Sequence, residues 1–136
     1  MTSRHFLAAL LATAALADTV QAQAPEEKVK PNFSYALPNV PGKSIVAVEV
    51  TYPPGGASAP HRHARSAFIY AYVVSGEIES QVDDGPARVF KAGESFYEVP
   101  GAHHRISRNA SGTTPAKLLA VFVVDSGDEP LTTPDK

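Results

Sequence analysis

Two short histidine clusters are the residues of this chain best suited to chemistry. His61 and His63 flank a single arginine, and His103 is followed directly by His104. On an extended strand, side chains at i and i+2 point to the same face, about 6 to 7 Å apart along the chain. His61 and His63 can therefore aim their imidazoles, the commonest protein ligands of transition metals, at one point. Three nitrogen ligands converge there if His103 or His104 folds back onto it; otherwise the clusters are solvated surface residues.

The composition excludes several classes of protein. A chain of 136 residues suits one domain. Its net charge of −2 gives no support for a nucleic-acid surface. Because the chain has no cysteine, a disulfide framework, a thiolate metal site and a cysteine nucleophile are all excluded.

The first 22 residues have the pattern of a secretory signal peptide. Arg4 and His5 form a short positive start, and an apolar run follows from Phe6 to Ala17. Val20-Gln21-Ala22 then supplies small residues at −3 and −1 of a cleavage site. The run is shorter than the roughly 20 residues of a membrane span, so an N-terminal anchor helix is the weaker alternative. We expect an exported protein, periplasmic or secreted, that has no membrane segment after cleavage.

The remaining sequence predicts an all-β domain. Residues 23–42 are rich in proline and indicate an extended arm, in which alternating aromatic residues could dock on a sheet edge or a partner subunit. Residues 43–126 consist of short β-branched and aromatic runs separated by Gly and Pro turns, which is typical of a sandwich or barrel. Residues 127–136 form a polar tail that we expect to be loose. A small barrel has a mouth that can hold one ligand.

With their surroundings, the histidine clusters resemble the two motifs of the cupin superfamily. Gly55-x5-His61-x-His63, followed by Tyr72-Val73-Val74-Ser75-Gly76, is similar to the first motif. Gly93-Glu94 followed by Pro100-Gly101-x2-His104 is similar to the second. The resemblance implies a single jelly-roll β-barrel, often a homodimer, that holds a metal inside. It also implies that His61, His63 and His104 are ligands and that His103 lies at the pocket rim or on the surface.

The chain departs from the family pattern at one ligand. The family usually has a glutamate four or five residues after the second histidine, but Ala67, Phe68 and Ile69 occupy this region. Three interpretations stay open: three histidines hold the metal, another side chain replaces the glutamate, or the site has lost its metal. Glu98 is the best replacement, as a ligand or as a general base, because an inward carboxylate would need a partner. Tyr70 is a weaker candidate, whose phenol hydroxyl could donate a hydrogen bond to a bound oxygen atom.

These features lead to two hypotheses for function. The first is a metal-dependent enzyme that carries out dioxygenase-, isomerase- or lyase-like chemistry on a small oxygenated organic substrate. Its cofactor would be one divalent transition metal, and nitrogen-rich ligation does not choose among Fe, Mn, Ni, Cu and Zn. The second is a non-catalytic cupin that binds or senses a small ligand. The changed ligand set favours the second hypothesis, and the converging histidines favour the first.

Overall fold

A computed structural model describes residues 22–136 of the chain, so nearly all of the predicted signal peptide lies outside the described residues. Those residues form strands and turns without a helix, which confirms the predicted all-β fold. None of residues 22–136 belongs to a helix long and apolar enough to cross a membrane. The strands are β1 Lys28–Ala36, β2 Lys43–Tyr52, β3 Ala57–Ser58, β4 His61–His63, β5 Phe68–Ser75, β6 Glu77–Val82, β7 Arg88–Lys91, β8 Ser95–Glu98, β9 His103–Asn109, β10 Ala116–Asp125 and β11 Thr132–Pro134.

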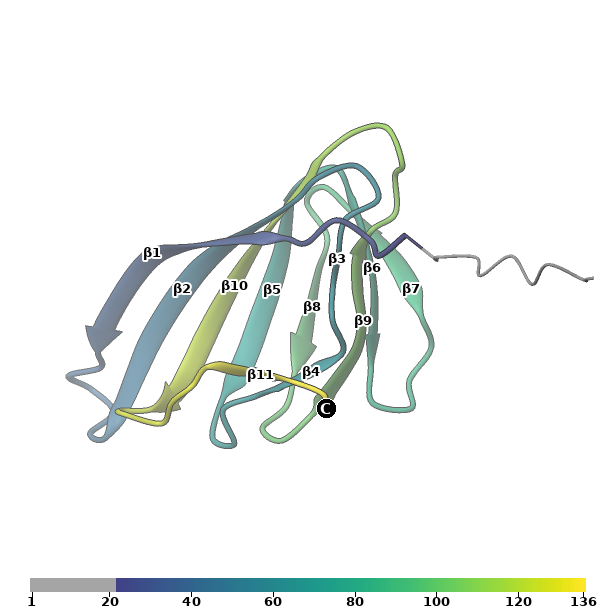
Figure 1. Cartoon of the computed structure of the whole chain (residues 1–136). Helices are drawn as coiled ribbons and strands as arrows, with labels where there is room; N and C mark the ends of the chain where they lie inside the picture. Colours follow the sequence, from purple (N-terminus) through teal and green to yellow (C-terminus); the bar gives the residue numbers. More distant parts are fainter. Residues whose placement is uncertain (1–21) are drawn as a thin grey trace, which may run out of the picture.

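The strands form two antiparallel sheets of a jelly-roll (Figure 1). One sheet has the order β1-β2-β10-β5-β8, and the other has the order β11-β4-β9-β6-β7, with β3 also paired to β9. The long strands β2 and β10 pair along their whole length, from Lys43 opposite Asp125 to Tyr52 opposite Ala116. Their runs of Val, Ile and Leu suit the pleated, half-buried surface of a central strand.

Alternation along the strands places the core between the two sheets. In β5 the buried residues Ile69, Ala71 and Val73 alternate with exposed aromatic and aliphatic residues. One core cluster gathers around Val73, Ile78 and Leu118, and a second gathers around Ile69 and Phe122. Period-2 alternation of this kind is what fixes which face of a strand turns inward.

Gly76 marks the turn between β5 and β6 and ends the first cupin-like motif. Its φ of +72° lies in the left-handed region, which a residue with a side chain adopts at a cost. A Cβ at this position would lie 2.7 Å from the carbonyl oxygen of Pro115 and 2.8 Å from the Cβ of Ala116. The close approach of the 115–116 backbone therefore requires glycine at this turn.

The two flanking segments both join the sheets. Residues 28–36 of the predicted arm form β1, which pairs with β2 as an edge strand and stays exposed along its length. The arm thus docks on a sheet edge, one of the two alternatives. The prediction of a loose tail was wrong for its end, because Thr132–Pro134 forms β11 and pairs with β4 beside the histidines. A polar composition hid this strand, since its pairing uses backbone groups rather than apolar side chains.

Candidate metal centre

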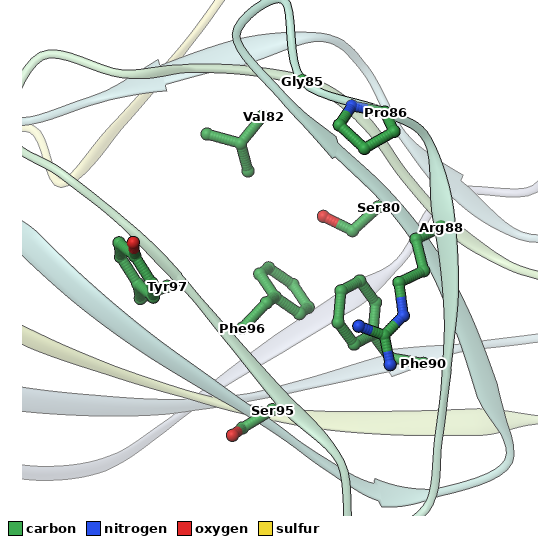
Figure 2. Close-up of a pocket in the computed structure, with 9 residues that line it drawn as sticks. All are labelled: Ser80, Val82, Gly85, Pro86, Arg88, Phe90, Ser95, Phe96 and Tyr97. Carbon is green, nitrogen blue, oxygen red and sulfur yellow. The ribbon is translucent and has the colours of Figure 1, made fainter.

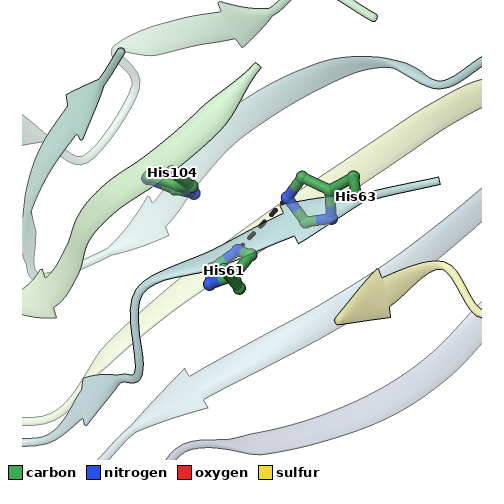
Figure 3. A group of neighbouring side chains, drawn as sticks. All are labelled: His61, His63 and His104. Atoms are coloured by element: carbon green, nitrogen blue, oxygen red, sulfur yellow. Dashed lines mark hydrogen bonds between the residues drawn. The ribbon is translucent and has the colours of Figure 1, made fainter. Parts of the chain in front are cut away.

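Strands β4 and β9 bring three histidines together (Figure 3). His61 and His63 project from the same side of β4, and His61 lies directly opposite His104 of β9. The ring centroid of His61 lies 4.7 Å from that of His63 and 5.0 Å from that of His104. One ligand nitrogen from each of the three histidines lies within 4.8 Å of the others. His103 instead turns away and its Nε2 lies 2.7 Å from a carboxylate oxygen of Asp135.

Backbone carbonyls fix the orientation of the two β4 histidines. Nδ1 of His61 lies 2.7 Å from the carbonyl oxygen of Ala59, and Nδ1 of His63 lies 3.1 Å from that of Leu131. Because a carbonyl oxygen only accepts, each Nδ1 carries the hydrogen and donates it. Each Nε2 then presents a lone pair to the interior, which is the arrangement found in histidines that bind metals.

Glu98 completes the group from strand β8. Its side chain is 3% exposed, and its Oε2 lies 3.3 Å from Nε2 of His63 and 3.4 Å from Nδ1 of His104. Its Oε1 is the only buried side-chain oxygen or nitrogen among the described residues that has no hydrogen-bond partner. A buried carboxylate is costly unless it is paired or binds a metal. The structure therefore places the sequence-predicted residues His61, His63, His104 and Glu98 together.

The spacing of these atoms fits a cation. Nε2 of His61 lies 3.2 Å from Nε2 of His63, and Oε2 of Glu98 lies beside the same nitrogen of His63. Three acceptor atoms repel one another at such distances. A proton on one nitrogen bridges a single pair, whereas a divalent cation satisfies all of them together. The residues present thus fit a metal ion.

The electrostatics favour the ligand form of each group. Burial lowers the pKa of His104 to about 4 and also lowers the pKa of His61, so both imidazoles are neutral near pH 7. For Glu98, burial alone would raise the pKa. The nearby His63 and His104 outweigh burial, and the pKa of Glu98 lies below its ordinary value. Neutral imidazoles and an ionised carboxylate are the protonation states that bind a metal.

The group lies at one side of a cavity of about 390 Å³ inside the barrel, which we call the metal pocket. Its apolar wall comes from the inner faces of β2, β5 and β10, including Val48, Ala71 and Phe122. Its polar part includes the Tyr52 hydroxyl, which lies 2.8 Å from Ser58 Oγ and 2.7 Å from Ser107 Oγ. A small molecule inside the pocket would therefore meet the histidines on one side and an apolar wall on the other.

Tyr70 does not belong to this group. Its side chain is 45% exposed, on the face of β5 opposite to the buried Ile69 and Ala71. It does not line the metal pocket. The candidate role for Tyr70 was wrong because the period-2 alternation of β5 sends every second residue to the outside of the sheet.

Sequence reasoning missed several residues around the histidines. Ser80 Oγ lies 2.9 Å from Nε2 of His104 and is buried. Its position between Ile78 and Val82 on the inner face of β6 was the available signal. Leu131 and Thr132 of the tail contact Nδ1 of His63, Thr132 through its Oγ1 at 3.1 Å. No pattern in a polar tail indicates this contact.

The fold and the site together agree with a family match. Residues 48–122, more than half of the chain, match the family described as the Cupin domain. The chain belongs to the cupin family. The predicted resemblance is thereby confirmed, and the matched segment contains His61, His63, Glu98 and His104.

The chain is also similar to individual proteins. The germin-like protein subfamily 2 member 2 of Arabidopsis thaliana is 31% identical over 90 residues. The match covers 63% of this cupin but 40% of that relative, so the chain spans about two fifths of the relative's length. A solved oxalate oxidase is 26% identical with a TM-score of 0.54, over 62% of this chain and 44% of that one. A Klebsiella pneumoniae protein with a double-stranded β-helix domain is 22% identical with a TM-score of 0.62, covering 84% and 90% of the two chains, and shares the fold.

Proposed function

We propose that this cupin is a metal-dependent enzyme that acts on a small oxygenated organic substrate. The observation that carries the proposal is the meeting of His61, His63 and Glu98. Nε2 of His63 lies 3.2 Å from Nε2 of His61 and 3.3 Å from Oε2 of Glu98. His104 adds a further nitrogen from the neighbouring strand. One divalent transition metal, such as Fe, Mn, Ni, Cu or Zn, would be held by the three histidines and Glu98.

The metal would act as a Lewis acid toward the substrate. The residues of the chain would orient the ligands, supply negative charge and form the wall of the pocket. The carbonyl oxygens of Ala59 and Leu131 hold the hydrogen of His61 and His63 on Nδ1 and keep Nε2 free. Glu98 supplies negative charge, and its Oε1 has no hydrogen-bond partner among the described residues. Phe122 and Ala71 form an apolar wall that offers water no hydrogen-bond partner.

The size and lining of the metal pocket support a small substrate. A cavity of about 390 Å³ lies near the lower end of the range of small-molecule sites. The solved oxalate oxidase, at 26% identity, supports a small organic acid as the substrate class. Dioxygenase-, isomerase- and lyase-like reactions all suit a Lewis acid beside such a substrate.

The test is the metal content of the purified protein without a histidine tag. We expect about one transition-metal ion per chain by mass spectrometry, with loss of metal in His61→Ala and reduced metal in Glu98→Ala. His103→Ala is the matched control, because this histidine contacts Asp135 rather than the other histidines. Absence of metal after reconstitution with all five ions would refute a metal enzyme. Turnover is then sought with a panel of small organic acids, with O₂ uptake and product analysis as readouts.

A second candidate is a cupin that binds a small ligand without turnover. The observation that favours it is the apolar stretch Ala67 to Ile69, where the family usually has a glutamate. Such a module without metal would keep its ligand affinity in His61→Ala. An enzyme would lose metal and turnover together in that variant.

We also propose export and a homodimer. The N-terminal signal pattern supports export, which a fractionation experiment with and without residues 1–22 tests. The resemblance to other cupins and the exposed aromatic side chains of the outer face of β5, Phe68, Tyr70 and Tyr72, support the dimer. Light scattering on the purified protein should give twice the mass of one chain, and a monomer would contradict the proposal.

A further inference from the structure

A second cavity opens at the side of the barrel, between the edge strands of the two sheets. Strand β8 ends one sheet and β7 ends the other, and the cavity of about 380 Å³ lies between them (Figure 2). We call it the lateral pocket. Its lining residues are Ser80, Val82, Gly85, Pro86, Arg88, Phe90, Ser95, Phe96 and Tyr97. None of these lines the metal pocket.

Aromatic rings form much of the wall of the lateral pocket. The rings of Phe90 and Phe96 lie with their centroids 4.9 Å apart, and Tyr97 stands at the opposite margin from Arg88 in Figure 2. Val82 and Pro86 add further apolar surface. Aromatic rings pack best against other flat surfaces, through stacking or edge contacts. The wall therefore suits a flat, apolar body.

Arg88 places one positive charge beside this apolar wall. It lies directly opposite Ser80 in the β6–β7 pair, so both residues belong to the inner face of the hairpin. Its guanidinium carbon lies 4.7 Å above the centre of the Phe90 ring. One of its nitrogens lies 3.3 Å from Glu94, which leaves other N–H groups of the planar fork for a ligand. Among the described residues, Arg88 is the one charged side chain that lines this cavity, and its ion-pair partner Glu94 does not line it.

The lateral pocket adjoins the metal pocket at His104, which lines the metal pocket and contacts Ser80 of the lateral pocket. Nδ1 of His104 faces Glu98 in the metal pocket, and its Nε2 faces Ser80 in the lateral pocket. On β8, Phe96 and Glu98 are successive inward residues, and they line different cavities. A ligand in the lateral pocket would thus touch neighbours of His104 without touching the metal.

We propose that the lateral pocket binds a small aromatic carboxylic acid. The ring of the acid packs against Phe90 and Phe96, and its carboxylate pairs with the guanidinium of Arg88. A guanidinium matches a carboxylate with two parallel hydrogen bonds, and such pairs are among the strongest in proteins. The ligand is bound without any covalent change and without a metal contact.

The test is a calorimetric titration of the full protein with cinnamate, compared with the neutral cinnamyl alcohol. We expect saturable binding of cinnamate at one site and weaker binding of the alcohol. Arg88→Gln should lower the affinity for cinnamate by about tenfold or more, because a charged hydrogen-bond pair is lost. The affinity for the alcohol should change by less than about twofold. Arg65→Gln is the matched control, because it removes the same charge from a residue that lines neither pocket.

A further variant separates this proposal from the metal-enzyme proposal. His61→Ala removes a metal ligand, and we expect cinnamate to bind to it as to the original protein. Loss of cinnamate binding in His61→Ala but not in Arg88→Gln would place the acid at the metal and overturn the proposal. Equal binding of cinnamate to Arg88→Gln and to the original protein would also overturn it, and would leave Arg88 as a charge that protects an edge strand. An amide NMR spectrum that is unchanged away from the substituted residue shows that each variant is folded.

Discussion

Ile69 and Glu98 lie directly opposite each other in the antiparallel pair of β5 and β8. Both side chains point into the barrel, and each residue is 2% exposed. Opposite residues of an antiparallel pair share one face of the sheet, with Cβ atoms about 4.5 to 5.5 Å apart. Residues 67–69 cover the region where the cupin resemblance places a glutamate. The carboxylate of this chain therefore reaches the histidines from the strand next to the usual one.

This relationship predicts that a carboxylate at position 69 can replace the carboxylate at position 98. Glu98→Ile alone should lower metal affinity at least tenfold, because one charged ligand is lost. The double variant Ile69→Glu with Glu98→Ile should recover part of that loss, since the two positions share a face. Metal titration followed by mass spectrometry of bound ion measures both effects. If the double variant binds metal no better than Glu98→Ile, the two positions are not equivalent.

The C-terminal strand should control metal affinity through His63. Removal of residues 130–136 takes away the carbonyl of Leu131 and the hydroxyl of Thr132, both 3.1 Å from Nδ1 of His63. Loss of partners that orient a ligand typically costs 10- to 100-fold in metal affinity. We expect a loss of about this size in a competition titration against a chelator.

A shorter truncation provides the control for the tail. Removal of residues 135–136 deletes Asp135, which contacts His103, and leaves the contacts to His63 in place. Its metal affinity should stay within about threefold of that of the full chain. A similar loss in both truncations would mean that the tail acts through general stability instead.

The metal-free protein should lose stability in mild acid. The pKa of His104 falls from an ordinary value of 6.5 to about 4 on burial, so between these values the unfolded chain binds a proton that the folded chain does not. Stability is therefore fully present above about pH 6.5 and decreases as the pH falls toward 4. The slope from this one histidine is at most about 1.4 kcal/mol per pH unit.

Urea unfolding in the presence of a chelator, at several pH values, measures this slope. His104→Gln removes the titrating group, so its stability should change less steeply across the same range. His61, whose pKa is also lowered by burial, leaves a remaining slope in that variant. Parallel curves for the two proteins would argue against a neutral, buried His104.

Two glycines with similar backbone angles should differ in their tolerance of alanine. Gly76→Ala should cost about 2 to 4 kcal/mol of unfolding free energy, from left-handed strain together with a clash of the new Cβ with the 115–116 backbone. Gly93 has a φ of +89°, but apart from its two chain neighbours no atom of residues 22–136 lies within 4 Å of an added Cβ. Gly93→Ala should therefore cost only the strain, about 1 kcal/mol. Denaturant unfolding of the two variants checks the difference, and equal costs would mean that the 115–116 backbone moves aside.

Local pattern in the sequence determined the fold class and half of the site. Alternating apolar residues and Gly or Pro turns specify strands by short-range physics, because the side-chain period of a strand is 2. The same period placed His61 and His63 on one face, and the two motifs pointed to His104 as their partner. The lack of a carboxylate between His63 and Glu77 was also visible in the sequence, which drew attention to Glu98.

Only the tertiary structure decided which side chains share the interior. Whether Glu98 and Tyr70 turn inward depends on strand register and on which face of each sheet is covered, and a shift of one residue reverses both. Register places Glu98 among the histidines and Tyr70 on the outside. Ser80 and Leu131 reach the histidines from 24 and 68 residues away along the chain, through pairings that no local pattern encodes. Long-range backbone pairing, rather than residue type, thus completed the site.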